Sequence, residues 1–165
     1  MNMEPDEKIQ AHVVSIWRES KKFFSIGGRE GMLILTDKHL MFVHKTEAKK
    51  KWWDAIRQRQ TVQFLKSKNT MIVHDGYNET NLKEDLENEK NVELRFDDIL
   101  NISNEEKEWG SILLIEYEKD GKLETHQYAI AQDWVKYPVK EPTKYMKADW
   151  TPFVQYIKSR QKITR

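Results

Sequence analysis

Two short apolar runs separated by three polar residues are the feature of this chain that most limits its fold. Residues 31–35 read GMLIL, residues 39–43 read HLMFV, and Thr36-Asp37-Lys38 stands between them. Each run has the length of a β-strand and is too short for a typical helix. A tight polar turn between two such runs predicts a pair of antiparallel strands.

Strand signals continue on both sides of this pair. Alternating or short apolar runs predict five further strand segments, over residues 9–20, 92–96, 99–102, 111–119 and 122–131. Glycines at 27, 28 and 31 predict a turn after the first segment, and Asp120-Gly121 predicts a hairpin turn between the last two. A kink is expected at Asp97-Asp98. The chain should therefore be rich in strands.

Residues 46–90 differ in both pattern and charge. The larger apolar side chains, with one glutamine, fall within about 120° on a helical wheel and predict a helix over 47–60 capped by Thr46; they are Trp52, Trp53, Ile56, Gln60 and Phe64. Residues 61–74 fit either a helix or a hairpin, and an acidic helix is expected over 79–89. Between 44 and 68, eight lysines and arginines face two acids, whereas six acids face two lysines between 75 and 90.

The chain ends with the signal of an amphipathic helix. Asp149 is placed to cap it, Pro152 suits its first turn, and positions 150, 153, 154, 156 and 157 form an apolar stripe. Pro138 and Pro142 predict an irregular stretch before it. From 134 to 165, eight basic residues face two acids. Such an excess suits an anionic partner, but also an ordinary solvated face.

Composition narrows the function. The chain has 165 residues and no cysteine, so we expect a single domain over 1–165 in a cytoplasmic setting, without disulfides or thiolate metal sites. No apolar run approaches the roughly 20 residues of a membrane helix, and the acidic start is not a secretory signal. Nucleotide-binding and hydrolase motifs are absent, and the five histidines lack metal-ligand spacing. We therefore expect no enzymatic activity, cofactor or metal.

The order of these elements resembles the pleckstrin-homology-like (PH-like) superfold, in particular its GRAM and bacterial PH-like branches. The resemblance is carried by Glu7-Lys8-Ile9, by residues 31–43, which are similar to the G-x-L-x-L-T-x-x-R-L-x-F run of GRAM-type domains, and by residues 96–102. It covers residues 7–44 and 92–163. His39 stands where that run has Arg, and the insertion over 46–90 has no counterpart in a minimal domain.

The resemblance implies an α+β, mainly β fold. It is a bent antiparallel barrel capped by the C-terminal helix, with inserted helices between strands three and four. Members bind phosphoinositides, other acidic lipids or protein segments, and lipid-binding members present basic side chains beside the loop after the first strand. Here those candidates are Arg18, Lys21, Lys22, Arg29 and Lys38, expected to meet at one barrel end. We therefore expect a binding module for an acidic membrane surface or protein, peripheral to the membrane in the first case.

A second candidate surface combines a basic cluster with two adjacent rings: Lys49, Lys50, Lys51, Trp52 and Trp53. These could meet a lipid interface, a second copy of the chain or single-stranded nucleic acid. The last option, with the basic segment 46–68 and the basic tail, gives the alternative function of a nucleic-acid-associated protein. The simpler interpretation is that both rings pack the inserted helix onto the barrel while the lysines remain in water.

Overall fold

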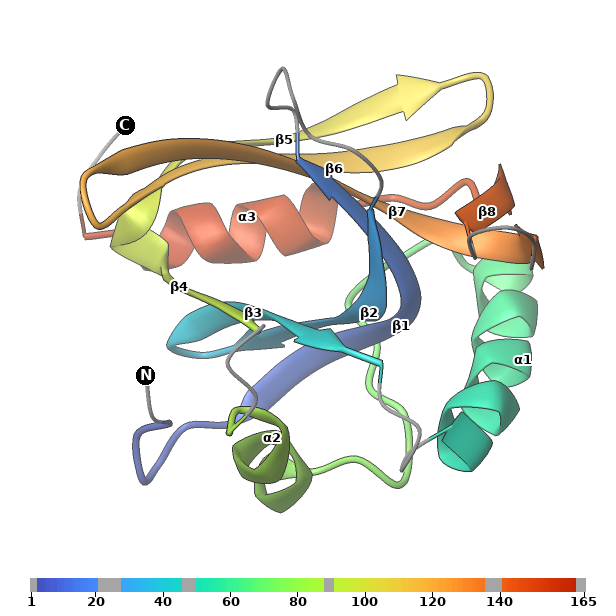
Figure 1. The fold of residues 1–165 in the computed structure, drawn as a ribbon, viewed down its shortest axis with the longest axis horizontal. Helices are drawn as coiled ribbons and strands as arrows, with labels where there is room; N and C mark the ends of the chain where they lie inside the picture. The colour runs from blue at the N-terminus through green and yellow to red at the C-terminus, as the bar shows by residue number, and fades with distance from the viewer. Residues whose placement is uncertain (1–2, 21–27, 46–49, 88–90, 136–140, 163–165) are drawn as a thin grey trace.

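The computed structural model describes residues 3–20, 28–45, 50–87, 91–135 and 141–162 (Figure 1). It confirms an α+β, mainly β protein with a C-terminal helix, and places two helices between the third and fourth strands. The strands are β1 (Ile9–Ser20), β2 (Arg29–Thr36), β3 (His39–His44), β4 (Val92–Arg95), β5 (Ile99–Lys107), β6 (Gly110–Lys119), β7 (Lys122–Val135) and β8 (Glu141–Tyr145). The helices are α1 (Lys50–Lys66), α2 (Glu79–Asp85), α3 (Thr151–Arg160) and the short 3₁₀ helix η2 (Phe96–Asp98).

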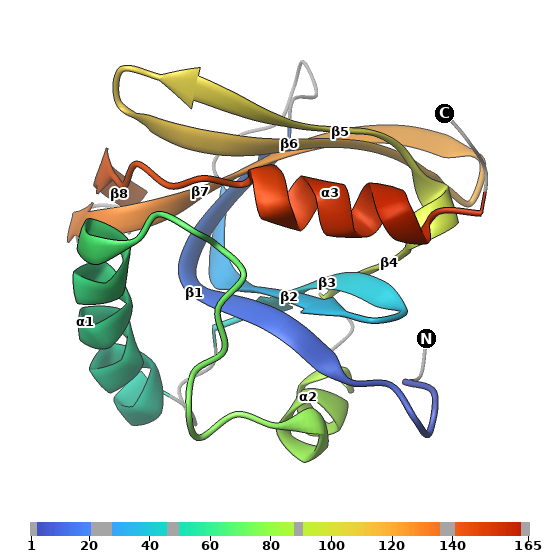
Figure 2. The same ribbon diagram turned by 180° about the vertical axis from the view of Figure 1, so that it is seen from behind.

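The strands form one antiparallel sheet in the order β4-β3-β2-β1-β7-β6-β5, and β8 pairs with β7. The sheet bends so that the half made by β2, β3 and β4 faces the half made by β5, β6 and β7. Figures 1 and 2 show α3 lying between these two halves. The main core fills this space, to which α3 contributes buried Phe153, Val154 and Ile157.

The bend lies in β1. Up to Val13 the register of β1 is with β2, and from Ile16 onward β1 pairs with both β2 and β7. Between these segments the register shifts, and Ser15 has φ 60°, a value that non-glycine residues rarely adopt. The Ser15 hydroxyl donates to Ala131 O (3.3 Å) and accepts from Trp134 Nε1 (3.1 Å). This bulge turns β1 from one half of the sheet into the other.

The insertion covers the edge of β1 that β7 leaves open. His12 N donates to Ile72 O (2.8 Å), so the segment after α1 runs along the first half of β1. The side-chain amide of Gln60 bonds both main-chain groups of Val14, accepting from its N (2.8 Å) and donating to its O (2.7 Å). The exposed edge of a strand invites unwanted pairing, and here α1 and residues 67–74 protect it.

The insertion also buries the outer face of the β1–β3 sheet. A second core cluster joins outward side chains of these strands to buried residues of the insertion; it contains Val14, Met32, Ile34, Met41, Val43, Trp53, Ile56, Tyr77 and Leu82. Leu33 and Leu35 face the main core instead. Because both faces of β2 and β3 are covered, their sequences are continuous apolar runs without alternation.

The expectation of a closed barrel is wrong, because β4 and β5 are the two ends of the strand order. The chain passes between them through η2, and side chains satisfy main-chain groups there. Gln161 Nε2 donates to Phe96 O (2.8 Å) and Ile99 O (2.9 Å), and Lys119 Nζ donates to Glu93 O (3.0 Å). Hydrogen bonds from side chains thus replace part of the missing strand pairing.

Three local expectations also differ from the structure. Residues 61–66 continue α1, and residues 67–74 belong to no helix or named strand, so neither a helix nor a hairpin fills 61–74. Pro142 belongs to β8, an edge strand, where a missing N–H is tolerated. The N-cap of α3 is Trp150, although the Asp149 carboxylate accepts from Thr151 N (2.9 Å). Thr46, the expected cap of α1, lies outside the described residues.

Candidate functional site

The structure brings two of the expected anion-binding residues together and separates a third. Arg18 near the end of β1 pairs directly with Arg29 at the start of β2. Lys38 lies in the β2–β3 turn, at the other end of β2. The eight residues of β2 place it about 20 Å or more from Arg29. The expected convergence of all these cations at one end is therefore wrong for Lys38. Lys21 and Lys22 lie outside the described residues.

Arg18 and Arg29 share one face of the sheet, because side chains of directly paired residues point the same way. It is the inner face, since Ile16, two residues before Arg18, belongs to the main core. On its other side Arg18 pairs with Tyr128 of β7. Like charges placed directly opposite each other destabilise a sheet unless something compensates them. Within the part of the chain that the structure describes, neither arginine forms an ion pair with an acidic side chain.

The Arg18 side chain is half-buried among aromatic rings. Its guanidinium carbon lies 4.9 Å from the centre of the Phe42 ring, and its Nη1 is buried without a hydrogen-bond partner within the described chain. The Phe42 ring in turn lies 5.7 Å from Tyr128 and 5.7 Å from His44. A cation over a ring gains some stabilisation, but not the hydrogen bonds that its N–H groups lose on leaving water.

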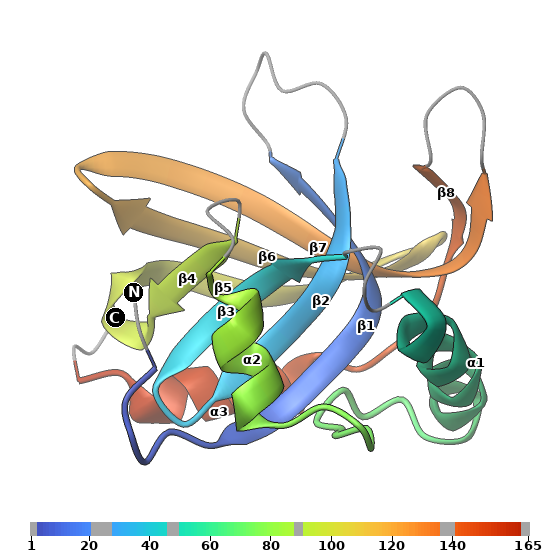
Figure 3. The same ribbon diagram turned by 60° about the horizontal axis from the view of Figure 1, so that its bottom comes forward.

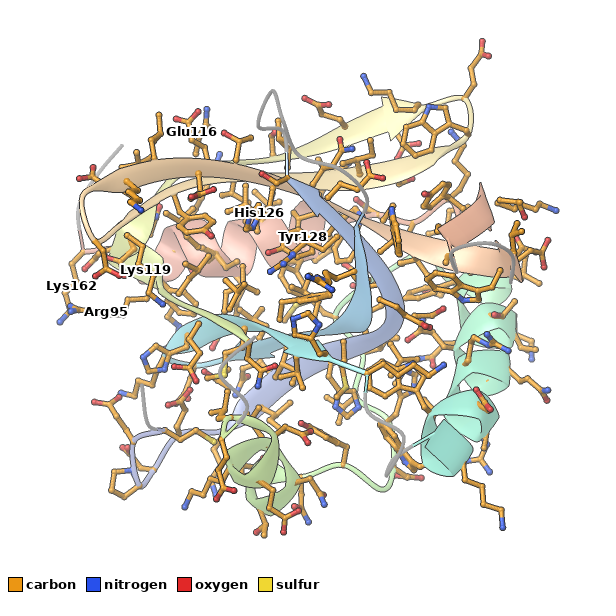
Figure 4. All side chains as sticks on the ribbon, viewed as in Figure 1. Arg95, Glu116, Lys119, His126, Tyr128 and Lys162 are labelled. Atoms are coloured by element: carbon orange, nitrogen blue, oxygen red, sulfur yellow. The ribbon has the colours of Figure 1, made fainter. Side chains whose placement is uncertain are left out.

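The neighbouring tyrosines respond to this charge. Burial raises the pKa of Tyr128, and the positive charge of Arg18 offsets part of this rise. Burial, with the charge of Glu124, raises the pKa of Tyr117 to about 12, again against the effect of Arg18. Both phenols stay neutral at pH 7, so neither offers a negative charge to balance the positive charge of the Arg18 guanidinium. Figure 4 shows Tyr128 and His126 between the two halves of the sheet.

The site can be completed by an anion. A phosphate or carboxylate group between Arg18 and Arg29 would accept hydrogen bonds from both guanidinium groups and remove their mutual repulsion. Aromatic side chains would line its inner side. Phe42 and Tyr128 were not expected as site residues, because only the long-range pairing of β1 with β7 and the packing of β3 bring them to Arg18. His126 lies next to Tyr128, with 6.3 Å between the ring centres.

The second candidate surface is divided by the fold. Trp53 is 1% exposed and belongs to the outer core. Trp52 is half-buried, stacks on Tyr77 (5.5 Å between ring centres, 27°) and donates from Nε1 to Asp75 O (3.0 Å). Lys51 is exposed on α1. Lys49 lies outside the described residues, as does the side chain of Lys50. Both tryptophan rings therefore help to hold the insertion on the sheet.

A buried histidine pair lies beneath this insertion. The rings of His12 and His74 stack (5.2 Å, 20°), His74 N donates to His12 Nε2 (2.6 Å), and His74 Nε2 lies 3.0 Å from Gln60 Oε1. Burial and the charge of His74 lower the pKa of His12 to about 3, and burial and the charge of Arg59 lower that of His74 to about 4. The pair is neutral at pH 7 and connects β1 to the insertion.

Among the described residues, no three side chains of His, Cys, Asp and Glu gather as metal ligands would. No described helix has the length and apolar character needed to cross a bilayer. No protein-family model matches the chain, and a search of curated proteins found no match.

Proposed function

We propose that the chain is a non-catalytic PH-like binding module that engages the phosphate of an anionic lipid headgroup between Arg18 and Arg29. One observation carries this proposal: a half-buried arginine, without an acidic partner among the described residues, lies directly opposite a second arginine. The strand order and the helix between the two halves support the family, together with the sequence resemblance. The chain would then act at the membrane periphery.

The position of the pair favours a headgroup over a broad contact. Arg18 lies near the last residue of β1 and Arg29 is the first residue of β2, so both stand at one end of the inner face. Lys21 and Lys22 follow within the connecting segment in the sequence. Each basic side chain close to an anionic bilayer contributes on the order of 1 kcal/mol. A phosphate reaching the arginines would add charge-assisted hydrogen bonds.

Nucleic acid is the less supported partner. Sequence-tolerant binding of single strands uses exposed aromatic rings on which bases stack, beside cations that meet the backbone. Trp52 is engaged with Tyr77 and Asp75, and Trp53 is buried. The basic side chains of α1 can still attract the nucleic-acid backbone, but neither tryptophan ring is free to stack on bases.

Vesicle co-sedimentation tests the proposal. The full chain should bind phosphatidylcholine vesicles that contain phosphatidylserine or a phosphoinositide, should not bind pure phosphatidylcholine, and should bind less at higher salt. Arg18→Gln should weaken binding roughly tenfold, the loss of one strong charge-assisted contact of about 1.4 kcal/mol. Lys66→Gln, which removes one exposed charge from α1, is the matched control and should change binding little.

Two results would contradict the proposal. One is equal binding by wild type and Arg18→Gln, which would remove the arginine pair from the site. The other is the absence of salt-sensitive vesicle binding; poly-glutamate and a single-stranded oligonucleotide, titrated in parallel, would then show whether an acidic protein segment or nucleic acid is the partner.

A further inference from the structure

A cavity of about 570 Å³ lies at the end of the molecule opposite the arginine pair. It is formed where the β2–β3 turn, η2 and the end of α3 meet. Four cationic side chains from these separate segments line it: Lys38, Arg95, Arg160 and Lys162. Figure 4 shows Arg95 and Lys162 at the same end of the molecule. Its size is that of a small-molecule site, for which 300–1,000 Å³ is typical.

Two of the three acidic side chains that line this cavity already accept hydrogen bonds from main-chain groups. Asp97 Oδ1 accepts from Lys162 N (2.8 Å), and Asp37 Oδ1 accepts from Lys8 N (2.9 Å). Below them, buried Glu7 bonds to His39 Nδ1 (3.0 Å) and to the Thr36 hydroxyl. These contacts fix the carboxylates as parts of the wall.

The cations are held much more loosely. Lys38 lies 4.0 Å from Glu4, and both side chains are substantially exposed, a pairing worth little in water. Arg160 lies over the Tyr156 ring at 5.0 Å, which leaves its N–H groups available to a ligand. Arg95 and Lys162 are exposed. The positive groups can therefore turn toward a ligand, whereas the bonded acids Asp37 and Asp97 are held in place.

We infer that this cavity binds a small, multiply charged phosphate compound. Two arginines offer planar donor pairs that match phosphate oxygens, and two lysines add charge on either side. A compound with one negative charge would face four cations and three acids, Glu4, Asp37 and Asp97, with little net attraction. Two linked phosphates can reach cations on opposite walls at once. The site is independent of the Arg18–Arg29 pair.

A titration of the full chain with sodium pyrophosphate, followed by amide chemical shifts, tests this inference. Saturable shifts should appear near residues 38, 95–97 and 160–162. The double variant Arg95→Gln, Arg160→Gln should lower the affinity at least tenfold, and Arg18→Gln should leave shifts at this end unchanged. Lys66→Gln controls for general loss of charge, and thermal unfolding checks that each variant is folded. Inorganic phosphate should bind more weakly than pyrophosphate.

Three results would overturn it. The first is an absence of saturable shifts at this end, and the second is unchanged affinity in the double variant. The third is an equal loss of affinity in Lys66→Gln, which would show unspecific attraction. If only residues near Arg18 and Arg29 respond, this inference fails while the proposed function is unaffected. If only the cavity responds, this inference holds, and the vesicle experiment with Arg18→Gln decides the proposed function separately.

Discussion

At the scale of single residues, Gly31 allows β3 to pack closely against β2 beside the arginine pair. Gly31 pairs with His44 of β3 and lies against Phe42, the ring that carries the Arg18 guanidinium. A Cβ at this position would lie 2.4 Å from Val43 O and 2.5 Å from the Phe42 ring. The glycine is thus required by the close approach of β3, and it allows Phe42 to pack beneath Arg18.

We expect Gly31→Ala to destabilise the protein by roughly 1–3 kcal/mol, because the main-chain oxygen of Val43 cannot move away without disturbing the β2–β3 pairing. Urea unfolding measures this. Gly121→Ala is an informative comparison: no atom lies within 4 Å of its added Cβ, but its φ of 74° disfavours alanine, so only a backbone cost of about 1 kcal/mol is expected. Equal stability of Gly31→Ala and wild type would contradict the close packing described here.

At the scale of elements, Gln60 attaches α1 to β1. Gln60→Ala leaves the N–H and C=O of Val14 buried without their partners, and we expect a loss of about 2–4 kcal/mol in the free energy of unfolding. Gln58→Ala, an exposed position on the same helix, should change stability by less than about 0.5 kcal/mol. Hydrogen exchange at Val14 should speed up in the first variant only. Similar stabilities of the two variants would show that the helix is held by its apolar side chains alone.

The histidine pair makes the attachment of the insertion sensitive to acid. The pKa values of His12 and His74 are about 3 and 4 in the folded protein, below the ordinary value near 6.5, so the unfolded chain binds more protons as the pH falls. Stability is fully present above pH 6.5 and should fall by roughly 6 kcal/mol on going to pH 4, with about half of the loss from each histidine. Denaturant unfolding at several pH values measures the slope. His74→Asn should reduce this slope; an unchanged slope would assign the acid sensitivity to other groups.

The local pattern predicted most elements because their signals are local. The hairpin turns at Asp37 and Asp120 and the apolar runs around them specify β2, β3, β6 and β7. β8 was not predicted, because a proline in a strand is acceptable only at an edge, and the sequence does not show which strands are edges. Barrel closure was mispredicted, because the Gln161 contacts that satisfy the β4–β5 gap join residues more than 60 positions apart.

The site was predictable only in part for the same reason. Arg18 and Arg29 flank one turn, so their proximity follows from the hairpin alone. Lys38 lies in the next turn, and the eight residues of β2 necessarily carry it to the other end of the sheet. Tyr128 and Arg18 are 110 positions apart in the chain, and their pairing cannot be predicted from the local alternation of apolar and polar residues.

At the scale of the molecule, the insertion acts as part of the core. Figure 3 shows α1 and α2 beside the β1–β3 part of the sheet. The register Phe42 with Val92 places the ends of β3 and β4 next to each other, so a short glycine-rich turn can replace residues 46–90. We expect this deletion variant to aggregate, because the outer apolar face of Met32, Ile34 and Met41 loses its cover.

Light scattering and dye binding measure this aggregation. Replacing those three outer side chains by threonine in the shortened chain should reduce its aggregation, whereas the same replacements in the full-length chain should destabilise it. A shortened chain that stays monomeric without these replacements would show that the insertion serves another purpose than covering the sheet.

The placement of Arg18 and Arg29 at one end of β2, and of Lys38, Arg95, Arg160 and Lys162 near the other, has a geometric consequence. One small ligand cannot reach both places, because the eight residues of β2 hold them about 20 Å or more apart. Two ligands bound at once would be kept at a fixed distance, with the strand as a spacer between them.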